Sequence, residues 1–340
     1  NKDDLQLFRM KKFSNILVTG GAGYIGSVLT RKLVLLKYNV KILDSLIFGQ
    51  DGISDLVSNN SVKLFVGDTR NKKTIVDILK DVDCVIHLAA IVGDPLCSKI
   101  PKAAKQINEL ATKHIIDSCK KAGVQRFVFA STCSNYGSTL GTVNEETPLE
   151  SLSLYSETKV KSEFNVLNSK EKSFEPCVLR FATAYGLSPR MRFDLLLQEF
   201  IRDALVDKKI SIFGSNHWRP LVHVDDIAFS CIAAIENSAN ISGEVYNVGD
   251  NNQNYTKKDL ADMVKKSIPS STIEITESKR DPRSYKVSFD KIRKNLNFKV
   301  SKTVEDGISE ILNSIKRGEL DPRDSEFSNL SKATENVKVF

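Results

Sequence analysis

The sequence predicts an α/β fold: a doubly wound parallel sheet with a smaller, partly interleaved C-terminal domain. Short, largely apolar runs alternate with segments of helical period from Asn15 onward. Such runs are typical of strands buried on both faces, and their alternation with helices implies parallel strands joined by right-handed crossovers. The rhythm changes after Gly186, and the 340 residues exceed the roughly 250–300 that one core usually serves, which favours a second domain.

The expected elements follow in chain order. We expect strands at residues 16–18, 40–43, 62–66, 84–88, 127–129 and 177–179, and helices at residues 24–36, 72–79, 103–121 and 155–167. Beyond Gly186 the pattern predicts a helix at 193–206, a strand at 210–213, a helix at 226–236 and a strand at 245–248. Thr256 and Asp259 form a Thr-x-x-Asp capping pattern, so another helix is expected to begin there.

These elements predict three parts of the chain. Residues 10–186 form a first domain, to which a strand and a helix return from about residues 220–250. Residues 187–320 form the second domain, and residues 321–340 form a polar, loose tail.

Composition excludes several classes of protein. The 49 basic residues stand against 42 acidic ones and are dispersed, so the net charge of +7 indicates a solvated surface and no nucleic-acid partner. The six cysteines and four histidines show no metal-binding spacing, so no metal is expected. Apolar runs stay shorter than the roughly 18 residues of a membrane span, and no secretory leader is recognisable. We expect a cytoplasmic protein with free thiols and no membrane partner.

The strongest motif is Thr-Gly-Gly-Ala-Gly-Tyr-Ile-Gly at residues 19–26, between the first strand and the first helix. Gly20, Gly23 and Gly26 provide a tight turn, backbone approach to a pyrophosphate at the helix N-terminus and close helix–strand packing. Asp44 ends the second strand, where a carboxylate accepts from both ribose hydroxyls and repels a 2′-phosphate. The unit predicts a Rossmann-type domain that binds NAD rather than NADP.

Residues after the third and fourth strands are further candidates for the cofactor site. Asp68 either faces the adenine amino group or caps the following helix, and the sequence favours neither. Leu88, Ala89 and Ala90 follow the fourth strand, where small side chains leave the cofactor a passage. His87 is expected to be a packed, hydrogen-bonded side chain.

Tyr155 and Lys159 form the candidate catalytic pair. Their spacing of four places both side chains on one face of a helix. A tyrosine titrates near pH 10, so its use as a base near neutrality requires its pKa to fall by about three units, worth roughly 4 kcal/mol. The neighbouring ammonium and a positive nicotinamide ring are the expected sources of that shift.

Together with Ser-Thr-Cys-Ser-Asn-Tyr-Gly at residues 131–137, these motifs carry a family resemblance. Over roughly residues 15–315 the chain resembles the extended short-chain dehydrogenase/reductases, among them the NAD-dependent nucleotide-sugar epimerases and dehydratases. The resemblance implies that Tyr24 and Ile25 contact the cofactor and that Thr132, next to Ser131, supplies the catalytic hydroxyl. Asn108 matches an asparagine that supports this site, and a buried structural amide is the alternative.

The resemblance also implies a substrate side that binds a nucleotide-diphosphate sugar. Thr183 replaces an asparagine in Leu-Arg-Phe-Ala-Thr-Ala-Tyr-Gly at 179–186, which puts one sugar-nucleotide hydrogen bond in doubt. Asp226 is expected to support the fold. Arginines suit a diphosphate because they bind phosphate bidentately. The candidates are Arg192, Arg219, Arg280 and Arg283.

The choice among reactions depends on the residues after Thr132. In the family's 4,6-dehydratases an Asp-Glu pair follows the catalytic hydroxyl, whereas Cys133 and Ser134 stand here, neither suited to that proton transfer. Residues 90–97 and 188–194 resemble a subgroup that includes a GDP-heptose 4-dehydrogenase. Oxidation at C4 by an epimerase is favoured and a 4-dehydrogenase or reductase is the alternative. A 4,6-dehydratase or a non-catalytic dinucleotide sensor is less favoured.

The family resemblance further implies a homodimer that forms through a four-helix bundle. The expected helices at 103–121 and 155–167 would contribute to it.

Overall fold

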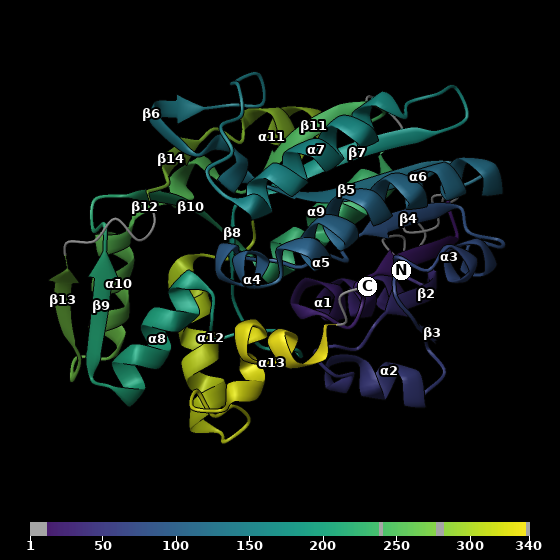
Figure 1. The fold of residues 1–340 in the computed structure, drawn as a ribbon. Helices are drawn as coiled ribbons and strands as arrows, with labels where there is room; N and C mark the ends of the chain where they lie inside the picture. The colour runs from purple at the N-terminus through teal and green to yellow at the C-terminus, as the bar shows by residue number, and fades with distance from the viewer. Residues whose placement is uncertain (1–11, 238–240, 277–281, 338–340) are drawn as a thin grey trace, which may run out of the picture.

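The computed structural model describes residues 12–237, 241–276 and 282–337. A seven-stranded parallel sheet forms its centre, in the order β3-β2-β1-β4-β5-β7-β11 (Figure 1). The strands are β1 (Asn15–Thr19), β2 (Asn39–Asp44), β3 (Lys63–Val66), β4 (Cys84–His87), β5 (Arg126–Thr132), β7 (Glu175–Phe181) and β11 (Glu244–Val248). The predicted doubly wound α/β fold is confirmed.

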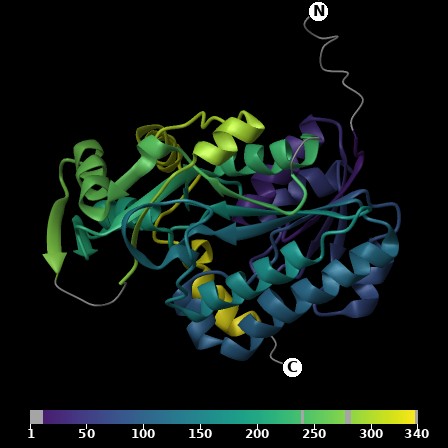
Figure 2. The same ribbon diagram turned by 90° about the horizontal axis from the view of Figure 1, so that it is seen from above.

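Helices cover both faces of this sheet, as Figure 2 shows from above. On one face lie α1 (Tyr24–Leu35) and α9 (Val224–Glu236), and on the other lie α3 (Lys72–Ile78), α6 (Ala111–Ala122) and α7 (Leu154–Asn168). Strand residues alternate between the two cores: Phe127 and Phe129 pack with α3 and α6, whereas Val128 packs in the core with α1 and α9. This alternation follows from the two-residue period of a strand.

The predicted helix at 103–121 is present as a continuous helical run over residues 101–122, but it contains a π-helical turn that the sequence does not predict. The structure has α4 (Asp94–Lys99), α5 (Pro101–Lys105), a π-helical turn (Gln106–Leu110) and then α6. The bulge occurs at Asn108, whose side chain bonds the backbone of Ile91 and whose carbonyl accepts from Thr112 and Ser162. Contacts with two other segments, at Ile91 and at Ser162 of α7, therefore accompany the π-helical turn, and helical period alone does not predict them.

The remaining elements form a second lobe around three small sheets. Strand β10 (Trp218–His223) lies between β8 (Thr183–Tyr185) and β12 (Asn254–Thr256), β9 (Lys209–Phe213) pairs with β13 (Thr272–Thr276), and β6 (Ser138–Val143) pairs with β14 (Ser284–Val287). The helices beside them are α8 (Leu196–Val206), α10 (Lys257–Ser267), α11 (Asp290–Leu296) and α12 (Val304–Lys316). Short α2 (Ser54–Ser58) follows β2.

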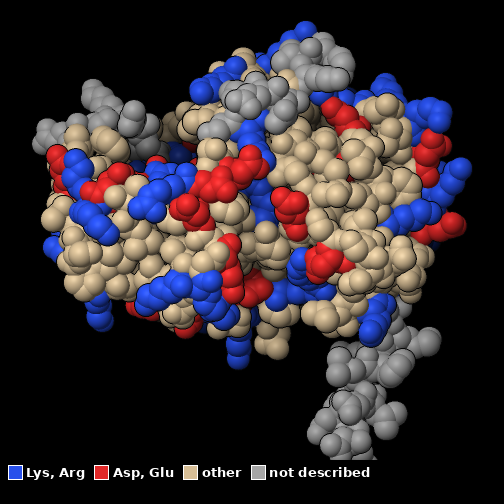
Figure 3. Space-filling view, turned by 90° about the horizontal axis from the view of Figure 1, so that it is seen from below, with Lys and Arg blue, Asp and Glu red and all other residues tan. Residues whose placement is uncertain are grey.

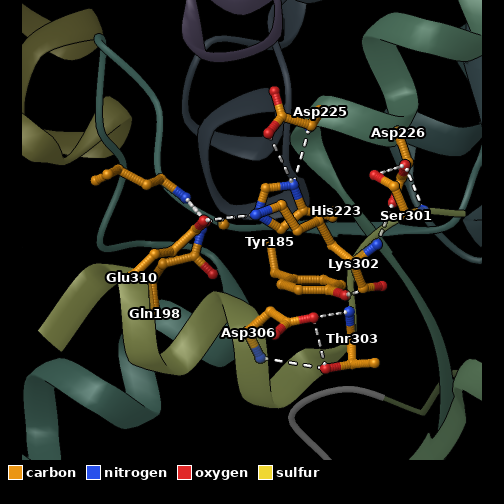
Figure 4. Close-up of polar contacts among 12 residues, drawn as sticks. Tyr185, Gln198, His223, Asp225, Asp226, Ser301, Lys302, Thr303, Asp306 and Glu310 are labelled. Atoms are coloured by element: carbon orange, nitrogen blue, oxygen red, sulfur yellow. Dashed lines mark hydrogen bonds and ion pairs between the residues drawn. The ribbon is translucent and has the colours of Figure 1, made fainter. Parts of the chain in front are cut away.

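His223 joins several segments where the two lobes meet (Figure 4). Its Nδ1 accepts from the backbone of Asp225 at 3.1 Å, and so Nε2 carries the proton that it donates to Glu310, 2.5 Å away. Glu310 also accepts from the backbone of Leu187 at 2.7 Å. Asp226 accepts from Ser301 and from the backbone of Lys302 (Figure 4), so it supports the fold as expected.

The expectation of a loose tail is wrong for residues 321–337. A short turn at Ser325–Phe327 leads into α13 (Asn329–Asn336), which packs against α4 (Figure 1). Ala333 of α13 is fully buried in an apolar cluster with Leu96 and Cys97 of α4. Apolar contacts therefore hold a segment whose polar composition predicts none.

Charged side chains of both signs are dispersed over the face of the molecule in Figure 3. On the face in Figure 3, acidic and basic side chains are intermixed rather than gathered by sign. No helix among the described residues has the length and apolar character that crossing a bilayer requires. Met10, where the first domain was expected to begin, lies outside the described residues, as does Arg280.

Candidate active site

The glycine motif and the Tyr/Lys pair meet at a cavity of about 150 Å³ at the carboxyl ends of β1, β4 and β5. The order of the sheet reverses between β1 and β4, the position where doubly wound sheets bind ligands. Predicted residues that line the cavity are Gly20, Gly23, Tyr24, Ile25, Gly26, Leu88, Ala90, Tyr155, Lys159 and Arg192. A neighbouring cavity of about 80 Å³ is lined by Asp44, Asp68, Ala89 and Ala90.

The glycine motif has the tight geometry that a dinucleotide cradle requires. Gly20 has a φ of +74°, and a Cβ there would lie 2.9 Å from the backbone nitrogen of Ala89. A Cβ on Gly26 would lie 2.1 Å from the carbonyl oxygen of Gly20. Helix α1 begins at Tyr24, immediately after the loop, so its N-terminus faces the cavity. The residues present therefore fit a pyrophosphate.

Asp44 ties the end of β2 to the glycine motif. Its carboxylate accepts from the backbone N–H of Ala22 at 3.0 Å and from that of Leu46 at 2.9 Å. Burial raises the pKa of Asp44 above its ordinary value, although these hydrogen bonds oppose the rise. Each carboxylate oxygen keeps a lone pair for a further donor, as binding of two ribose hydroxyls would need.

Asp68 lies at the smaller cavity and pairs with Arg70. The carboxylate accepts from the Arg70 guanidinium, with a shortest distance of 2.6 Å, and from the Arg70 backbone N–H. The alternative that Asp68 caps the following helix is wrong, because Asn71 caps α3 by accepting from the backbone of Thr74. The position of Asp68 at the cavity is therefore free of a capping role.

His87 is the packed, hydrogen-bonded side chain that the sequence predicts. It lies 2.6 Å from the hydroxyl of Thr19 and 3.0 Å from that of Thr112, and its ring centre is 5.8 Å from that of Phe127 and 5.9 Å from that of Phe129. Burial lowers the pKa of His87 to about 3, so the ring is neutral at physiological pH.

Tyr155 and Lys159 lie on α7 and face the larger cavity together. The Lys159 ammonium donates to the carbonyl of Ala130 at 2.8 Å and lies 6.0 Å from the centre of the Tyr155 ring. Burial lowers the pKa of Lys159 to about 8. Burial also raises the pKa of Tyr155, as do Cys97 and Asp94, while Arg192 and Arg283 lower it. The expected depression of the Tyr155 pKa is therefore absent in the protein alone.

Thr132 occupies the end of β5, but Ser131 rather than Thr132 lines the cavity. The Thr132 hydroxyl accepts from the backbone of Ser134 at 3.1 Å and lies 2.5 Å from its hydroxyl. Ser131 donates to the buried carboxylate of Glu163. The structure thus separates the two neighbouring hydroxyls: one caps a short turn and the other faces the cavity.

Sequence reasoning missed the buried ion pair between Arg180 and Glu163, whose carboxylate also contacts Ser131. Arg180 of β7 binds both carboxylate oxygens of Glu163 on α7, with a shortest distance of 2.7 Å, and also donates to the hydroxyl of Tyr136 at 2.9 Å. Tyr136 in turn donates to Asn247 on β11 at 2.8 Å. The network fixes α7, and with it Tyr155, against three strands of the sheet.

Asn108 and Thr183 are among the predicted residues that do not line either cavity. Asn108 is buried, and its amide contacts the backbone of Ile91 and the hydroxyl of Thr158. Of the two alternatives for Asn108, the structure agrees with the buried structural amide. The Asn108 side chain positions the loop that follows β4. Thr183 lies on β8 opposite Leu221 of β10.

The predicted arginines come from separate segments and already have protein partners. Arg192 lines the larger cavity and binds the carboxylate of Asp194 with two hydrogen bonds, of 2.9 and 3.0 Å. Arg283 pairs with Asp94 on α4 at 2.9 Å. Arg219 is buried and donates to the carbonyls of Trp218 and Arg283.

Arg190 is a cavity residue that sequence reasoning missed. It is buried, lines the same cavity as Arg192 and lies 4.8 Å over the ring of Phe48. Burial and the neighbouring Arg192 together lower the pKa of Arg190 to about 10. The sequence signal that could have identified Arg190 is its place two residues before Arg192.

Comparison with known proteins agrees with this geometry. A family model described as the NAD dependent epimerase/dehydratase family matches residues 16–249. An uncharacterised UDP-glucose epimerase of Bacillus subtilis is 35% identical over 246 residues, which are 69% of this chain and 76% of that protein. A putative UDP-glucose 4-epimerase of Methanocaldococcus jannaschii is 30% identical over 311 residues, 88% of this chain and 98% of that protein.

Solved structures agree with the sequence relatives. The structure of UDP-glucuronic acid 4-epimerase from Bacillus cereus in complex with UDP-glucuronic acid and NAD has a TM-score of 0.82 and 28% identity, and covers 89% of this chain and 99% of its own. The predicted resemblance to nucleotide-sugar epimerases and dehydratases is confirmed. The chain therefore belongs to the NAD dependent epimerase/dehydratase family, as an enzyme with NAD as its cofactor.

Proposed function

We propose that this enzyme inverts C4 of a nucleotide-diphosphate sugar through a 4-keto species. Bound NAD would supply a hydride acceptor that later returns the hydride to C4. Tyr155 takes the proton of the 4-hydroxyl group, and Lys159 stabilises the ionised Tyr155 and binds the nicotinamide ribose. Thr132 would hydrogen-bond the 4-hydroxyl group once its own hydroxyl turns from Ser134 toward the substrate. Support comes from the shared cavity of the glycine motif, Tyr155 and Lys159, and from the epimerase names of the relatives.

The pKa directions indicate when Tyr155 becomes a base. In the protein alone, burial keeps the phenol protonated because the ionised form is poorly solvated. The Lys159 pKa of about 8 leaves most of its ammonium charged at neutral pH. Positive charge on the bound nicotinamide adds to that of Lys159, so we propose that proton transfer to Tyr155 Oη begins only with cofactor in place.

The observation that carries epimerisation over dehydration is the chemistry at Cys133 and Ser134. Cys133 is fully buried, its thiol donates to the carbonyl of Arg180 at 3.2 Å, and burial raises the pKa of that thiol. Ser134 is buried against Thr132. Neither group is an acid or base for removing water from the sugar.

The arginines would bind the substrate diphosphate by exchanging partners. Arg192 and Arg283 each bind one protein carboxylate, on Asp194 and Asp94 respectively. A diphosphate offers more acceptor oxygens and more negative charge than either carboxylate. Arg219 lies beside Arg283, whose carbonyl it binds, so the two would approach the same group.

We also propose a cytoplasmic homodimer. Leu110, in the π-helical turn before α6, is 59% exposed, and Phe164 on α7 is 68% exposed. Exposed apolar side chains on these two helical segments suit a helical interface between two copies. The six cysteines are free thiols, which suits a reducing compartment.

The test incubates the enzyme and NAD with UDP-, GDP-, dTDP- and CDP-sugars, and follows absorbance of reduced nicotinamide together with NMR of the products. The expected result is the C4 epimer of one substrate without lasting accumulation of NADH. Stoichiometric NADH with a released 4-keto sugar would establish the 4-dehydrogenase alternative. A 4-keto-6-deoxy product would overturn the assignment from Cys133 and Ser134.

A further inference from the structure

The C-terminal segment, residues 324–337, crosses the cofactor cavity. In the sheet order β4-β1-β2, the segments after β4 and β2 flank the glycine motif, which follows β1. One apolar cluster joins the two flanks to the C-terminal segment. Its members from the flanks include Ile47, Phe48, Ile91, Leu96 and Ile107, and its members from the C-terminal segment are Leu330, Ala333 and Val337.

The start of this segment contacts residues next to Arg192, which lines the larger cavity. The backbone of Phe193 donates to the carbonyl of Phe327 at 2.8 Å, and their rings meet edge to face with centres 5.9 Å apart. The backbone of Asn329 donates to Asp194 at 3.1 Å, the same carboxylate that binds Arg192. The segment is therefore hydrogen-bonded to the carboxylate that also binds Arg192, a residue that lines the cavity.

Asn329 brings an unused polar group into the site. The residue is only 5% exposed and lines the same cavity as the glycine motif, Tyr155 and Lys159. Its side-chain oxygen is buried and has no hydrogen-bond partner. A buried acceptor without a partner costs free energy, so a ligand donor at this position would be favoured. NAD carries such donors on its ribose hydroxyls and its carboxamide, whereas its pyrophosphate carries none.

We propose that Asn329 is a cofactor-binding residue and that residues 324–337 form a strap that closes over bound NAD. Asn329 lines the cavity of about 150 Å³ that holds Tyr155, and Val337 lines a third cavity, of about 670 Å³, that Asp68 shares. Residues of the strap therefore border the site at both of these places. The strap is held to the site by side chains of the apolar cluster and pairs with no strand of the sheet.

Closure of the strap would hold NAD between turnovers. An epimerase returns its cofactor to the starting state in each cycle, so slow release of NAD costs it nothing. A dehydrogenase would need the strap to open every turnover. The inference rests on NAD alone, so tests without a sugar separate its failure from failure of the proposed reaction.

The first test disrupts the packing of the strap in the apolar cluster. Ala333→Asp places a carboxylate in the apolar cluster, and Val76→Asp, at a site on α3 that is 57% exposed, is the matched control. Exchange of bound radiolabelled NAD against excess unlabelled NAD measures release. We expect release from Ala333→Asp to be at least tenfold faster and release from the control to match the parent. Equal release from all three proteins would overturn the strap.

The second test removes the acceptor and keeps its bulk. Asn329→Leu should weaken the NAD dissociation constant about tenfold by calorimetry, while the melting temperature without NAD stays at or above that of the parent, because the unpaired oxygen is gone. Asn313→Leu, at an exposed site on α12, is the control. An unchanged dissociation constant would remove Asn329 from the cofactor site.

Hydrogen exchange provides a readout on the unaltered protein, even where Ala333→Asp does not fold. Amides of residues 325–337 should exchange more slowly once NAD is added. Unchanged exchange there, with slower exchange at the glycine motif, would show that NAD binds without the strap and would overturn the proposal.

Discussion

The two walls of the larger cavity are built differently. On one wall, Tyr155 and Lys159 lie a helical turn apart on α7, and the Lys159 ammonium is fixed to the end of β5 through the carbonyl of Ala130. On the other, Arg190 and Arg192 lie close together in the chain, and Arg192 is bound to the carboxylate of Asp194. Arg283, which does not line this cavity, is likewise bound to a carboxylate, that of Asp94. The first wall is organised before any ligand arrives, whereas the second must exchange its partners. Catalysis and substrate binding should therefore respond differently to mutation.

The largest expected effect is at Tyr155. Tyr155→Phe removes the proton acceptor and keeps the ring, so turnover should fall by about 10²–10⁴-fold, the usual contribution of a positioned acid or base. The NAD dissociation constant should stay within about twofold of the parent's. Steady-state rates on the substrate that the sugar panel identifies, with calorimetry of NAD, measure both. Unaltered turnover would contradict the mechanism.

Arg180 tests how firmly the catalytic wall is held. Arg180→Met leaves Glu163 buried without its partner, and loss of one member of a buried ion pair costs about 3–5 kcal/mol of unfolding free energy. Denaturant unfolding measures the loss. Arg293→Met is the control, because Arg293 pairs with Asp290 on the exposed surface and should contribute less than about 1 kcal/mol. Equal losses for the two variants would show that the network does not brace α7.

Asp44 tests the predicted ribose site, at the neighbouring smaller cavity. Asp44→Ala removes a charged acceptor, and hydrogen bonds to charged groups contribute about 1.5–3 kcal/mol, so NAD should bind about 10–100-fold more weakly. Discrimination against NADP should also fall, because no carboxylate then repels the 2′-phosphate. Calorimetry with both cofactors measures the two effects. An unchanged NAD affinity would remove Asp44 from the ribose site.

The smallest expected effect is at Asp94, which pairs with Arg283. Asp94→Asn weakens the ion pair that competes with the substrate for Arg283, so the KM for the nucleotide sugar should fall by up to about fivefold, the worth of a partly exposed ion pair. The same change removes a negative charge that raises the pKa of Tyr155. Ionisation of Tyr155 becomes easier, and the rise of kcat with pH should move to lower pH. Asp94→Glu, which retains the charge, should leave that profile in place.

The sequence predicts the parts of the site that local spacing determines. The glycine motif, Asp44 at the end of its strand, and Tyr155 with Lys159 each depend on a fixed interval along one element. Glu163 and Arg180 lie on different elements, and Asn329 enters the cavity from the far end of the chain, so their roles arise only from tertiary contacts. The π-helical turn at Asn108 was missed for the same reason, because its cause is a contact with Ile91.

The return of the chain into the central sheet has a consequence for folding and for protein engineering. Strand β11 covers the edge of β7, and α9 packs beside α1, although both follow Gly186 by many residues. A chain that ended at Gly186 would leave β7 as an apolar, unpaired edge strand, which invites aggregation. The cofactor-binding half is therefore not a module that can be cut out or exchanged at the point where the sequence rhythm changes.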